Sequence, residues 1–353
     1  MRPLLFVVVA IAAVTHAVTA QNSEVDSVRT AWFDRAGAPG GAWAGGDVGA
    51  SVLLPDGQSV WTWGDTFYGG VNPDGTLQPG WRFVQGNALT LTTSTGALTS
   101  IFGSGPSSLV KPATPGNWLW MADATLDQER LRVFMNEFYR TGSGMWDFAW
   151  TGRTWIASFT WSGLESVDLA PGSGNGIAWG SAIMEEWPYF YIYGDEEVPI
   201  PGFGNFHRVH VARVLQSAGL FGQWTYFSGL NFNGSSWVTN KNRSQALTLL
   251  GTRDNFCHVN GVRRLPDGRY GMLSMLFPGE TIDEYYATSP EGPWGNKTVL
   301  YRPPETGVGN QFSYMARYHP QFDSGSKTSI GYSVNGGTWG TNFYRPRFIL
   351  VDR

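Results

Sequence analysis

The sequence GGDVGASVLLPDGQSVWTWGDTFYG, residues 45–69, predicts two antiparallel strands joined by a tight turn. Residues 55–57 have the chemistry of a turn, since proline presets φ at the first corner position and glycine accepts a positive φ at the last. Aromatic and β-branched residues alternate from 59 to 63, as is typical of a strand. The start of the first strand and the end of the second lie at the same edge of a hairpin. We therefore expect Asp47 and Asp65 to lie near one another, opposite the turn.

Four further stretches of the chain repeat this order of strand, polar turn and strand. They span residues 118–137, 176–195, 256–276 and 313–335. Hairpins repeated in this way favour a β-propeller, whose radial repeats leave only short edges exposed. The expected fold class is therefore all-β, a five-bladed β-propeller forming one domain of residues 21–353. A two-sheet sandwich with long insertions is the alternative, and residues 129–138 could instead form a short helix capped by Asp127.

Composition limits the partners and the source of stability. The 353 residues are 15% aromatic and 15% charged, with a formal net charge of −4. An acidic chain argues against nucleic acid and anionic membranes as partners. The single Cys257 excludes an internal disulfide, so a large hydrophobic core must stabilise the fold. We expect a monomer.

The first 20 residues have the pattern of a secretory signal peptide. Arg2 precedes an apolar run over residues 4–14, and Val-Thr-Ala at 18–20 is a small-residue cleavage pattern. The run is too short to span a bilayer as a helix. A secreted, extracellular protein is expected. Three Asn-X-Ser/Thr triplets, at Asn233, Asn242 and Asn296, fit the acceptor pattern for glycosylation.

The returning strands of four hairpins end in acidic or amide residues. These residues are Asp65, Glu137, Asp195 and Asn335. In a propeller the four strand ends point to one mouth, so these side chains should meet there. His258 lies nine residues before the turn residue Asp267, as Asp47 lies nine before Asp56. The matching register places His258 at the same mouth. The alternative for each carboxylate is a local role in capping backbone N–H groups at a turn.

Tryptophans divide into two expected groups. Most of the 17 should be wedges in the core between blades, because each buries a large area. Those expected near the mouth, where an aromatic plane suits the C–H face of a sugar ring, are Trp43, Trp81, Trp120 and Trp179.

No cofactor or metal is predicted from the pattern of ligand residues. His207 and His210 are expected on one face of a strand, but no third ligand is in view. His258 follows Cys257, and one cysteine with scattered histidines makes no zinc pattern. We interpret His258 as a hydrogen-bonded histidine of the core or of the mouth.

Four segments carry a family resemblance: GGDVGASVLLPDGQSVWTWGDTF, WMADAT, YATSPEGPWG and YRPRFI. They resemble five-bladed β-propeller proteins related to endo-D-arabinanases and, more remotely, the arabinanase, β-xylosidase and invertase propellers. The resemblance runs from about Trp32 to the end. It implies a funnel-shaped sugar site on the central axis, with Asp47 as the acid of the first blade and Asp123 as the acid of the second. His258 stands where the wider group has a catalytic glutamate.

Glycoside hydrolysis requires a protonated acid and an ionised carboxylate at the scissile bond. Asp47 is the expected nucleophile or base, since the glycines beside it leave room for a substrate. Asp65 is the expected acid, or the group that raises a neighbour's pKa, and Asp123 is the other candidate. Glu137 and Asp195 are expected to orient hydroxyl groups.

The sequence thus predicts a secreted glycoside hydrolase-like protein acting on a polysaccharide, with a furanoside such as arabinan as one candidate. The alternatives are a carbohydrate-binding propeller without catalysis and a structural protein of an extracellular matrix or wall.

Overall fold

The computed structural model describes residues 22–34, 42–160, 162–200, 204–231, 234–252, 257–276, 279–336 and 344–353. The signal peptide expected over residues 1–20 and the acceptor residue Asn233 lie outside the described residues. None of the helices in the described part of the chain has the length and apolar character needed to cross a bilayer.

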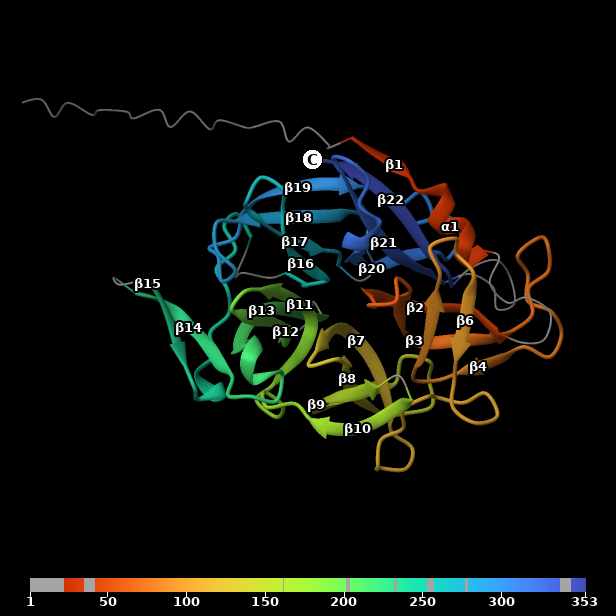
Figure 1. Ribbon diagram of the computed structural model, residues 1–353, viewed down its shortest axis with the longest axis horizontal. Helices are drawn as coiled ribbons and strands as arrows, with labels where there is room; N and C mark the ends of the chain where they lie inside the picture. Colours follow the sequence, from red (N-terminus) through yellow and green to blue (C-terminus); the bar gives the residue numbers. More distant parts are fainter. Residues whose placement is uncertain are drawn as a thin grey trace, which may run out of the picture.

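The chain folds into five antiparallel sheets placed around a common axis, as Figure 1 shows. The first sheet contains β2 (Ala42–Leu53), β3 (Ser59–Gly69), β4 (Arg82–Val84), β5 (Ala88–Thr92) and β6 (Leu98–Ile101). The second contains β7 (Trp118–Asp127), β8 (Arg130–Arg140), β9 (Phe148–Thr160) and β10 (Gly163–Leu169). The third contains β11 (Ile177–Glu186), β12 (Tyr189–Ile200), β13 (Gly204–Leu215), β14 (Thr225–Asn231) and β15 (Gly234–Val238).

The fourth sheet contains β16 (Gly261–Arg264), β17 (Tyr270–Ser274), β18 (Ile282–Ala287) and β19 (Gly295–Tyr301). The fifth contains β20 (Phe312–Tyr318), β21 (Lys327–Asn335), β22 (Pro346–Asp352) and β1 (Ser23–Val25). One α-helix, α1 (Ser27–Asp34), and three short 3₁₀ turns, Gln216–Ala218, Lys241–Arg243 and Pro320–Phe322, lie among the described residues.

The first full strand of each sheet faces the axis. In sequence order these strands are β2, β7, β11, β16 and β20, and each contacts the next, while β20 returns to β2. Figure 1 shows the same five strands nearest the centre. This closed ring confirms the predicted five-bladed β-propeller, and the two-sheet sandwich is wrong.

The turns of the first and fourth hairpins have the same hydrogen bond and the same glycine conformation. In the first, the Leu54 N–H donates to the Gln58 carbonyl at 2.8 Å, and Gly57 has a φ of 84°. In the fourth, the Leu265 N–H donates to the Arg269 carbonyl at 2.7 Å, and Gly268 has a φ of 86°. Glycine adopts this left-handed conformation without a Cβ clash, so the predicted Pro-Asp-Gly turns are confirmed.

The second hairpin also forms as two strands, so the alternative helix over residues 129–138 is wrong. Asp127 pairs with Arg130 across a two-residue turn, where Gln128 and Glu129 have φ values of 49° and 62°. Two positive φ values are what a type I′ turn requires, because its twist matches that of the strands.

We predict that Glu129→Gly stabilises the protein. A residue other than glycine in the left-handed region destabilises the folded state by about 1–2 kcal/mol, and glycine removes this cost. The extra freedom of glycine in the unfolded chain offsets part of the resulting gain in stability. The free energy of unfolding should rise by about 0.5–1 kcal/mol in urea titrations. The control is Thr99→Gly in β6, at an exposed strand position, which should lower the same quantity. A destabilised Glu129→Gly variant would contradict the turn assignment.

The ring is closed by pairing the two ends of the described chain. Strand β1 lies antiparallel to β22, with Ser23 opposite Val351 and Val25 opposite Ile349. Strand β1 is not predictable from the sequence, because three residues carry too little periodicity to indicate a strand. Strand β1 thereby completes the fifth sheet, and strands β20, β21 and β22 of that sheet contact β2 of the first sheet.

Candidate functional site

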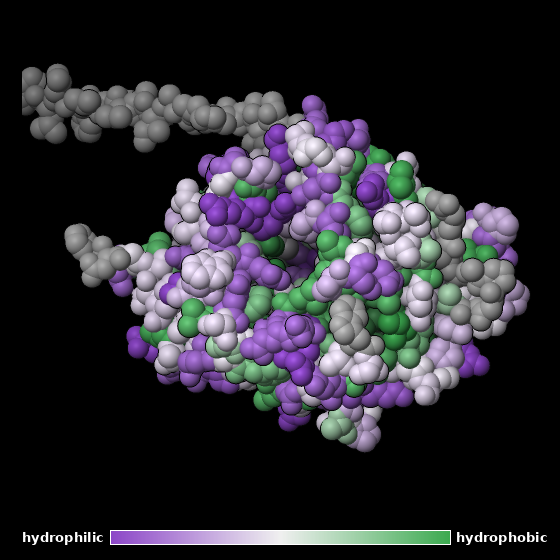
Figure 2. Space-filling view, in the orientation of Figure 1, coloured by the Kyte–Doolittle hydropathy of each residue, from purple (hydrophilic) through white to green (hydrophobic). Residues whose placement is uncertain are grey.

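A cavity of about 960 Å³ lies at the centre of the ring. All five sheets or their adjoining loops contribute polar residues to its wall: Asp47, Asp65, Asn136, Asp195, Asn260 and Asn335. Figure 2 shows a hollow near the middle of the face, where the five sheets of Figure 1 come together. The returning strands therefore do deliver polar side chains from distant parts of the sequence to one place.

Irregular pairing shapes the inner strands where they meet the cavity. Register shifts interrupt β2 on both sides of Val48, β7 between Met121 and Ala124, and β20 between Tyr314 and Arg317. The inner strand β11 is shifted in the same way. Bulges bend a strand and redirect its side chains, and they are frequent beside active sites. They explain how side chains here depart from simple alternation.

Backbone strain is concentrated at the same place. Val48, Met315 and Tyr344 have φ values of 75°, 54° and 64°, and all three line the cavity. A non-glycine residue held in this region costs of order 1–3 kcal/mol, and such residues cluster at active and ligand sites. The strain therefore marks the axial cavity as the candidate functional site.

Asp47 lies in the bulge of β2 and has a pKa suited to a base. Its Oδ2 accepts a hydrogen bond from the Tyr314 hydroxyl at 2.7 Å, and Tyr344 also donates to it. Burial raises the pKa of Asp47 to about 6, although both tyrosines stabilise the ionised form. Gly64 makes room for this carboxylate, because a Cβ there would collide with it.

The glycines that precede Asp47 allow two backbone segments to approach closely. A Cβ on Gly45 would lie 2.6 Å from the Tyr344 carbonyl oxygen, and the Gly46 N–H donates to that oxygen at 2.7 Å. The glycines before Asp47 thus allow the segment at Tyr344 to approach β2. This role differs from the expectation that they leave room for a substrate.

Asp65 is the second carboxyl group at this place. Its Oδ1 accepts hydrogen bonds from Trp120 Nε1 and from the Gly86 N–H, both at 2.7 Å. Burial, together with the negative charge of Asp47, raises the pKa of Asp65 to about 7. Since both of these hydrogen bonds end on Oδ1, Oδ2 is the oxygen suited to hold a proton.

The two carboxyl groups therefore differ in protonation near neutral pH. Asp47, with the lower pKa, is the group that ionises first, and Asp65 keeps its proton to a higher pH because a second negative charge near the first is unfavourable. An ionised carboxylate next to a protonated carboxyl group is the pair that acid–base chemistry on an oxygen leaving group requires.

Asp123 does not belong to this pair. Its Oδ2 accepts from the Ile183 N–H at 2.8 Å and its Oδ1 from the Ala124 N–H at 2.9 Å. It is not among the residues that line the cavity. Asp123 connects β7 to β11 through these hydrogen bonds, so we rank it behind Asp47 and Asp65 as a catalytic candidate.

Glu137 also points away from the mouth. Its Oε1 accepts from Asn117 Nδ2 at 2.6 Å and its Oε2 from Trp155 Nε1 at 3.0 Å, and the residue is 1% exposed. Neighbouring residues of a strand face opposite sides, so Asn136 enters the cavity in its place. The expectation that Glu137 binds a substrate hydroxyl is corrected accordingly.

Of the four tryptophans expected at the mouth, only Trp120 lines the cavity. Trp43 and Trp179 are fully buried, and Trp179 donates to the Gly172 carbonyl at 3.0 Å. Trp81 is partly buried and packs edge-on against Phe67 at 5.2 Å. These three are part of the aromatic core.

An aromatic wall forms one side of the cavity. Trp120 packs against Phe138 and Phe148 with ring centroids 4.4 and 5.0 Å apart. Trp146, 57% exposed, continues this wall beyond Phe148. The cavity thus combines a few polar groups with apolar surface, as small-molecule sites usually do.

Arg317 belongs to the inner strand β20 and lines the cavity. Its Nη1 donates to the carbonyls of Ser181 and Asn260, from the third and fourth sheets. Asp123 and Asp195 both interact with its charge, although burial lowers the pKa of the guanidinium. One side chain thereby connects three sheets beneath the cavity.

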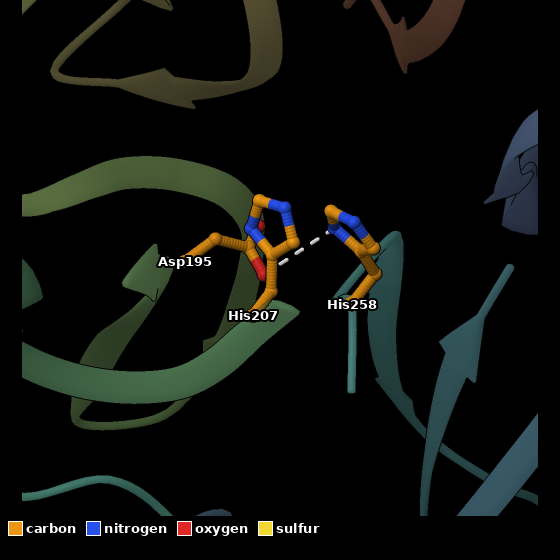
Figure 3. Close-up of side chains that lie close together, drawn as sticks. All are labelled: Asp195, His207 and His258. Carbon is orange, nitrogen blue, oxygen red and sulfur yellow. Dashed lines mark ion pairs between the residues drawn. The ribbon is translucent and has the colours of Figure 1, made fainter. Parts of the chain in front are cut away.

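Asp195 and His258 line the cavity together, as the register of their strands predicts. Figure 3 shows a third residue, His207, beside them. Ligand atoms of the three lie within 4.8 Å of one another. His210 is elsewhere, with Glu196 Oε2 3.2 Å from its Nε2, because residues three apart in a strand face opposite sides. The expectation that His207 and His210 share a face is wrong.

Tyr314, Tyr344, Asn136 and Arg317 are site residues that the sequence analysis did not assign. Tyr344 opens the YRPRFI segment, so the resemblance offered a signal for it. Tyr314 and Arg317 belong to an inner strand, but the bulge between them hides which residues turn inward.

Comparison with solved structures shows the same fold in other proteins. A presumed hydrolase from Bacteroides ovatus ATCC 8483 is similar at 19% identity and a TM-score of 0.72, over 93% of this chain and 90% of that one. CoXyl43, a GH43 β-xylosidase/α-arabinofuranosidase from a compost microbial metagenome, is similar at 13% identity and a TM-score of 0.50, over 86% and 90%.

No curated protein sequence matches this chain. The family model described as a domain of unknown function, DUF5005, matches residues 30–353. The chain therefore belongs to the DUF5005 family, and it shares its overall fold with these two solved structures.

Proposed function

We propose that this protein is a secreted glycoside hydrolase that cleaves a polysaccharide in the axial cavity. One observation carries the proposal: Asp47 and Asp65 face the same cavity, with pKa values of about 6 and about 7. Raised pKa values in a cavity are a feature of catalytic acids and bases. A purely structural wall protein has no need of two half-buried carboxyl groups at one cavity.

In the proposed mechanism Asp65 is the acid. Its proton passes to the glycosidic oxygen as the bond from that oxygen to the anomeric carbon breaks. Asp47, ionised, either attacks the anomeric carbon or removes a proton from the attacking water. The Tyr314 and Tyr344 hydroxyls hold the Asp47 carboxylate in position.

The remaining cavity residues are proposed to bind the sugar. The aromatic wall, with Trp120 at its centre, offers a surface to the C–H groups of a sugar ring. Two polar groups of the cavity wall can orient hydroxyls: Asn335 in β21 of the fifth sheet and Asp195 in β12 of the third. A furanoside polymer such as arabinan is the leading substrate class, supported by the shared fold with an enzyme named for xylosidase and arabinofuranosidase activities.

Incubation with a panel of polysaccharides tests the proposal directly. The panel should contain arabinan, arabinoxylan, xylan and a D-arabinan, with products separated by chromatography. Release of oligosaccharides from at least one furanoside polymer is expected. Binding to a sugar column without any product would instead favour a carbohydrate-binding propeller, and neither result would favour a structural protein.

Tyr314→Phe should move the acid limb of the pH–activity profile. Loss of its hydrogen bond, worth about 1–1.5 kcal/mol, destabilises the ionised Asp47 and raises its pKa by about one unit. The midpoint of the acid limb, from the pH dependence of kcat/KM, should rise by the same amount. Tyr332→Phe is the matched control, since its hydroxyl is 3.0 Å from Glu305 Oε2. An unshifted limb would remove Tyr314 from the mechanism.

A further inference from the structure

Three side chains from two neighbouring sheets meet beside the cavity. Asp195 comes from β12, His207 from β13 and His258 from the segment before β16, and Figure 3 shows the three side by side. The His258 Nδ1 lies 3.8 Å from an Asp195 carboxylate oxygen, and the two imidazole centroids are 3.6 Å apart. Strand pairing fixes two members and the contact between sheets supplies the third, so the group is held by the fold.

Ring nitrogens of these half-buried imidazoles lack hydrogen-bond partners within the described part of the chain. His207 Nδ1 is buried and has no hydrogen-bond partner among the described residues. The 3.8 Å between His258 and Asp195 exceeds a hydrogen bond. An unsatisfied buried polar atom is unfavourable, so the arrangement calls for a ligand that accepts lone pairs from nitrogen and oxygen together.

We propose that Asp195, His207 and His258 bind one divalent transition-metal ion, for which Zn²⁺ is the probe. Two imidazoles and one carboxylate are a donor set typical of open zinc sites and of other first-row metals. Calcium and magnesium prefer oxygen ligands alone. Three protein ligands leave at least one coordination position free, and Asp195 and His258 place it at the cavity wall.

A positive side chain lies close to the proposed ligands. The nearby positive charge of Arg317 is shared with Asp123 as well as Asp195.

The test is the metal content and Zn²⁺ affinity of the full chain, produced without a histidine tag and stripped with a chelator. Beyond the expected signal peptide the chain has four histidines, so competing sites are few. Titration calorimetry should give one Zn²⁺ per chain. Co²⁺ in place of Zn²⁺ should give visible absorption bands of a nitrogen- and oxygen-coordinated ion.

His207→Asn and His258→Asn should each weaken Zn²⁺ binding at least tenfold and remove the Co²⁺ bands. His210→Asn is the matched control on the same strand and should leave both unchanged. If His207→Asn fails to fold, His258→Asn decides, since that side chain is 23% exposed. Absence of Zn²⁺ binding, binding that survives the two substitutions, or preference for Ca²⁺ would overturn the proposal. The outcome is independent of whether the chain hydrolyses polysaccharides.

Discussion

Asp47→Asn is expected to lower kcat on the cleaved polysaccharide at least about a thousandfold, because an amide can neither attack the anomeric carbon nor accept a proton from water. The variant should fold, since asparagine has the same shape and its side-chain oxygen can still accept the Tyr314 hydrogen bond. Circular dichroism and the melting temperature check the fold, and product release measured at saturating substrate checks the rate.

Binding separates the hydrolase from the carbohydrate-binding alternative. The Asp47→Asn variant should still be retained on an affinity column of the substrate polymer, because the aromatic wall is unchanged. Asp123→Asn is the informative control, since Asp123 interacts with backbone N–H groups of β7 and β11. Its rate should stay within a fewfold of the wild type. A large loss in Asp123→Asn with an active Asp47→Asn would reverse the assignment.

Asp65→Asn is expected to lower kcat and, above neutral pH, to raise the free energy of unfolding. Removing a general acid lowers kcat by about a hundredfold to ten-thousandfold. The loss should be smallest for substrates with an activated leaving group, such as nitrophenyl glycosides, which depart without protonation. An equal loss for both kinds of substrate would show that Asp65 is not the acid.

The stability effect follows from the raised pKa of Asp65, about 7 against an ordinary value of 3.8. Below about pH 4 the carboxyl group is protonated in both states, and burial is tolerated. Between about pH 4 and pH 7, Asp65 is ionised in the unfolded chain but still protonated in the folded one. The free energy of unfolding of the wild type therefore falls as the pH rises, and it stays low above pH 7. Asparagine does not titrate and avoids this loss.

The gain of Asp65→Asn over the wild type should therefore grow from near zero at pH 4 to about 1–3 kcal/mol at pH 8, because each unit of pKa shift corresponds to about 1.4 kcal/mol. Water in the cavity weakens the effect of burial, so the expected gain in stability is smaller than the full pKa shift of Asp65 would give. Urea unfolding at pH 4.5, 6 and 8 measures it. Asn136→Ser, at the same cavity and hydrogen-bonded to Thr154, is the neutral control and should show a difference that does not vary with pH.

The same pKa values predict a narrow activity optimum. Activity should require Asp47 ionised, with a midpoint near pH 6, and Asp65 protonated, with a midpoint near pH 7. The pair titrates as a coupled unit, so the two limbs of a bell-shaped profile belong to both groups together. An optimum well above pH 8 would contradict this assignment of acid and base.

Local sequence chemistry was sufficient to predict the hairpins and the proximity of the Asp47 and Asp65 carboxyl groups. A Pro-Asp-Gly turn fixes its own conformation, and strand alternation needs only neighbouring residues. Asp47 and Asp65 lie on opposite sides of one such turn, so their meeting follows from the pairing of β2 with β3. Five repeats of the pattern then favoured a propeller.

Side-chain direction at the axis could not be predicted in the same way. A single extra residue in a strand moves every following side chain to the other face, and four of the five inner strands have such bulges. The returning strand β8 illustrates the problem, since Asn136 enters the cavity while Glu137 is buried behind it. Trp179 is likewise a core residue although its position along the hairpin suggested the mouth.

Contacts between distant segments were decided by the tertiary structure alone. His207 and His258 meet across two sheets, β1 pairs with β22, and Tyr344 reaches Asp47 from near the end of the chain. These contacts depend on how the sheets pack around the axis, and no local preference encodes that packing. The sequence by itself determined the blades and one pair of acids. Which further groups surround that pair was determined by the closing of the ring.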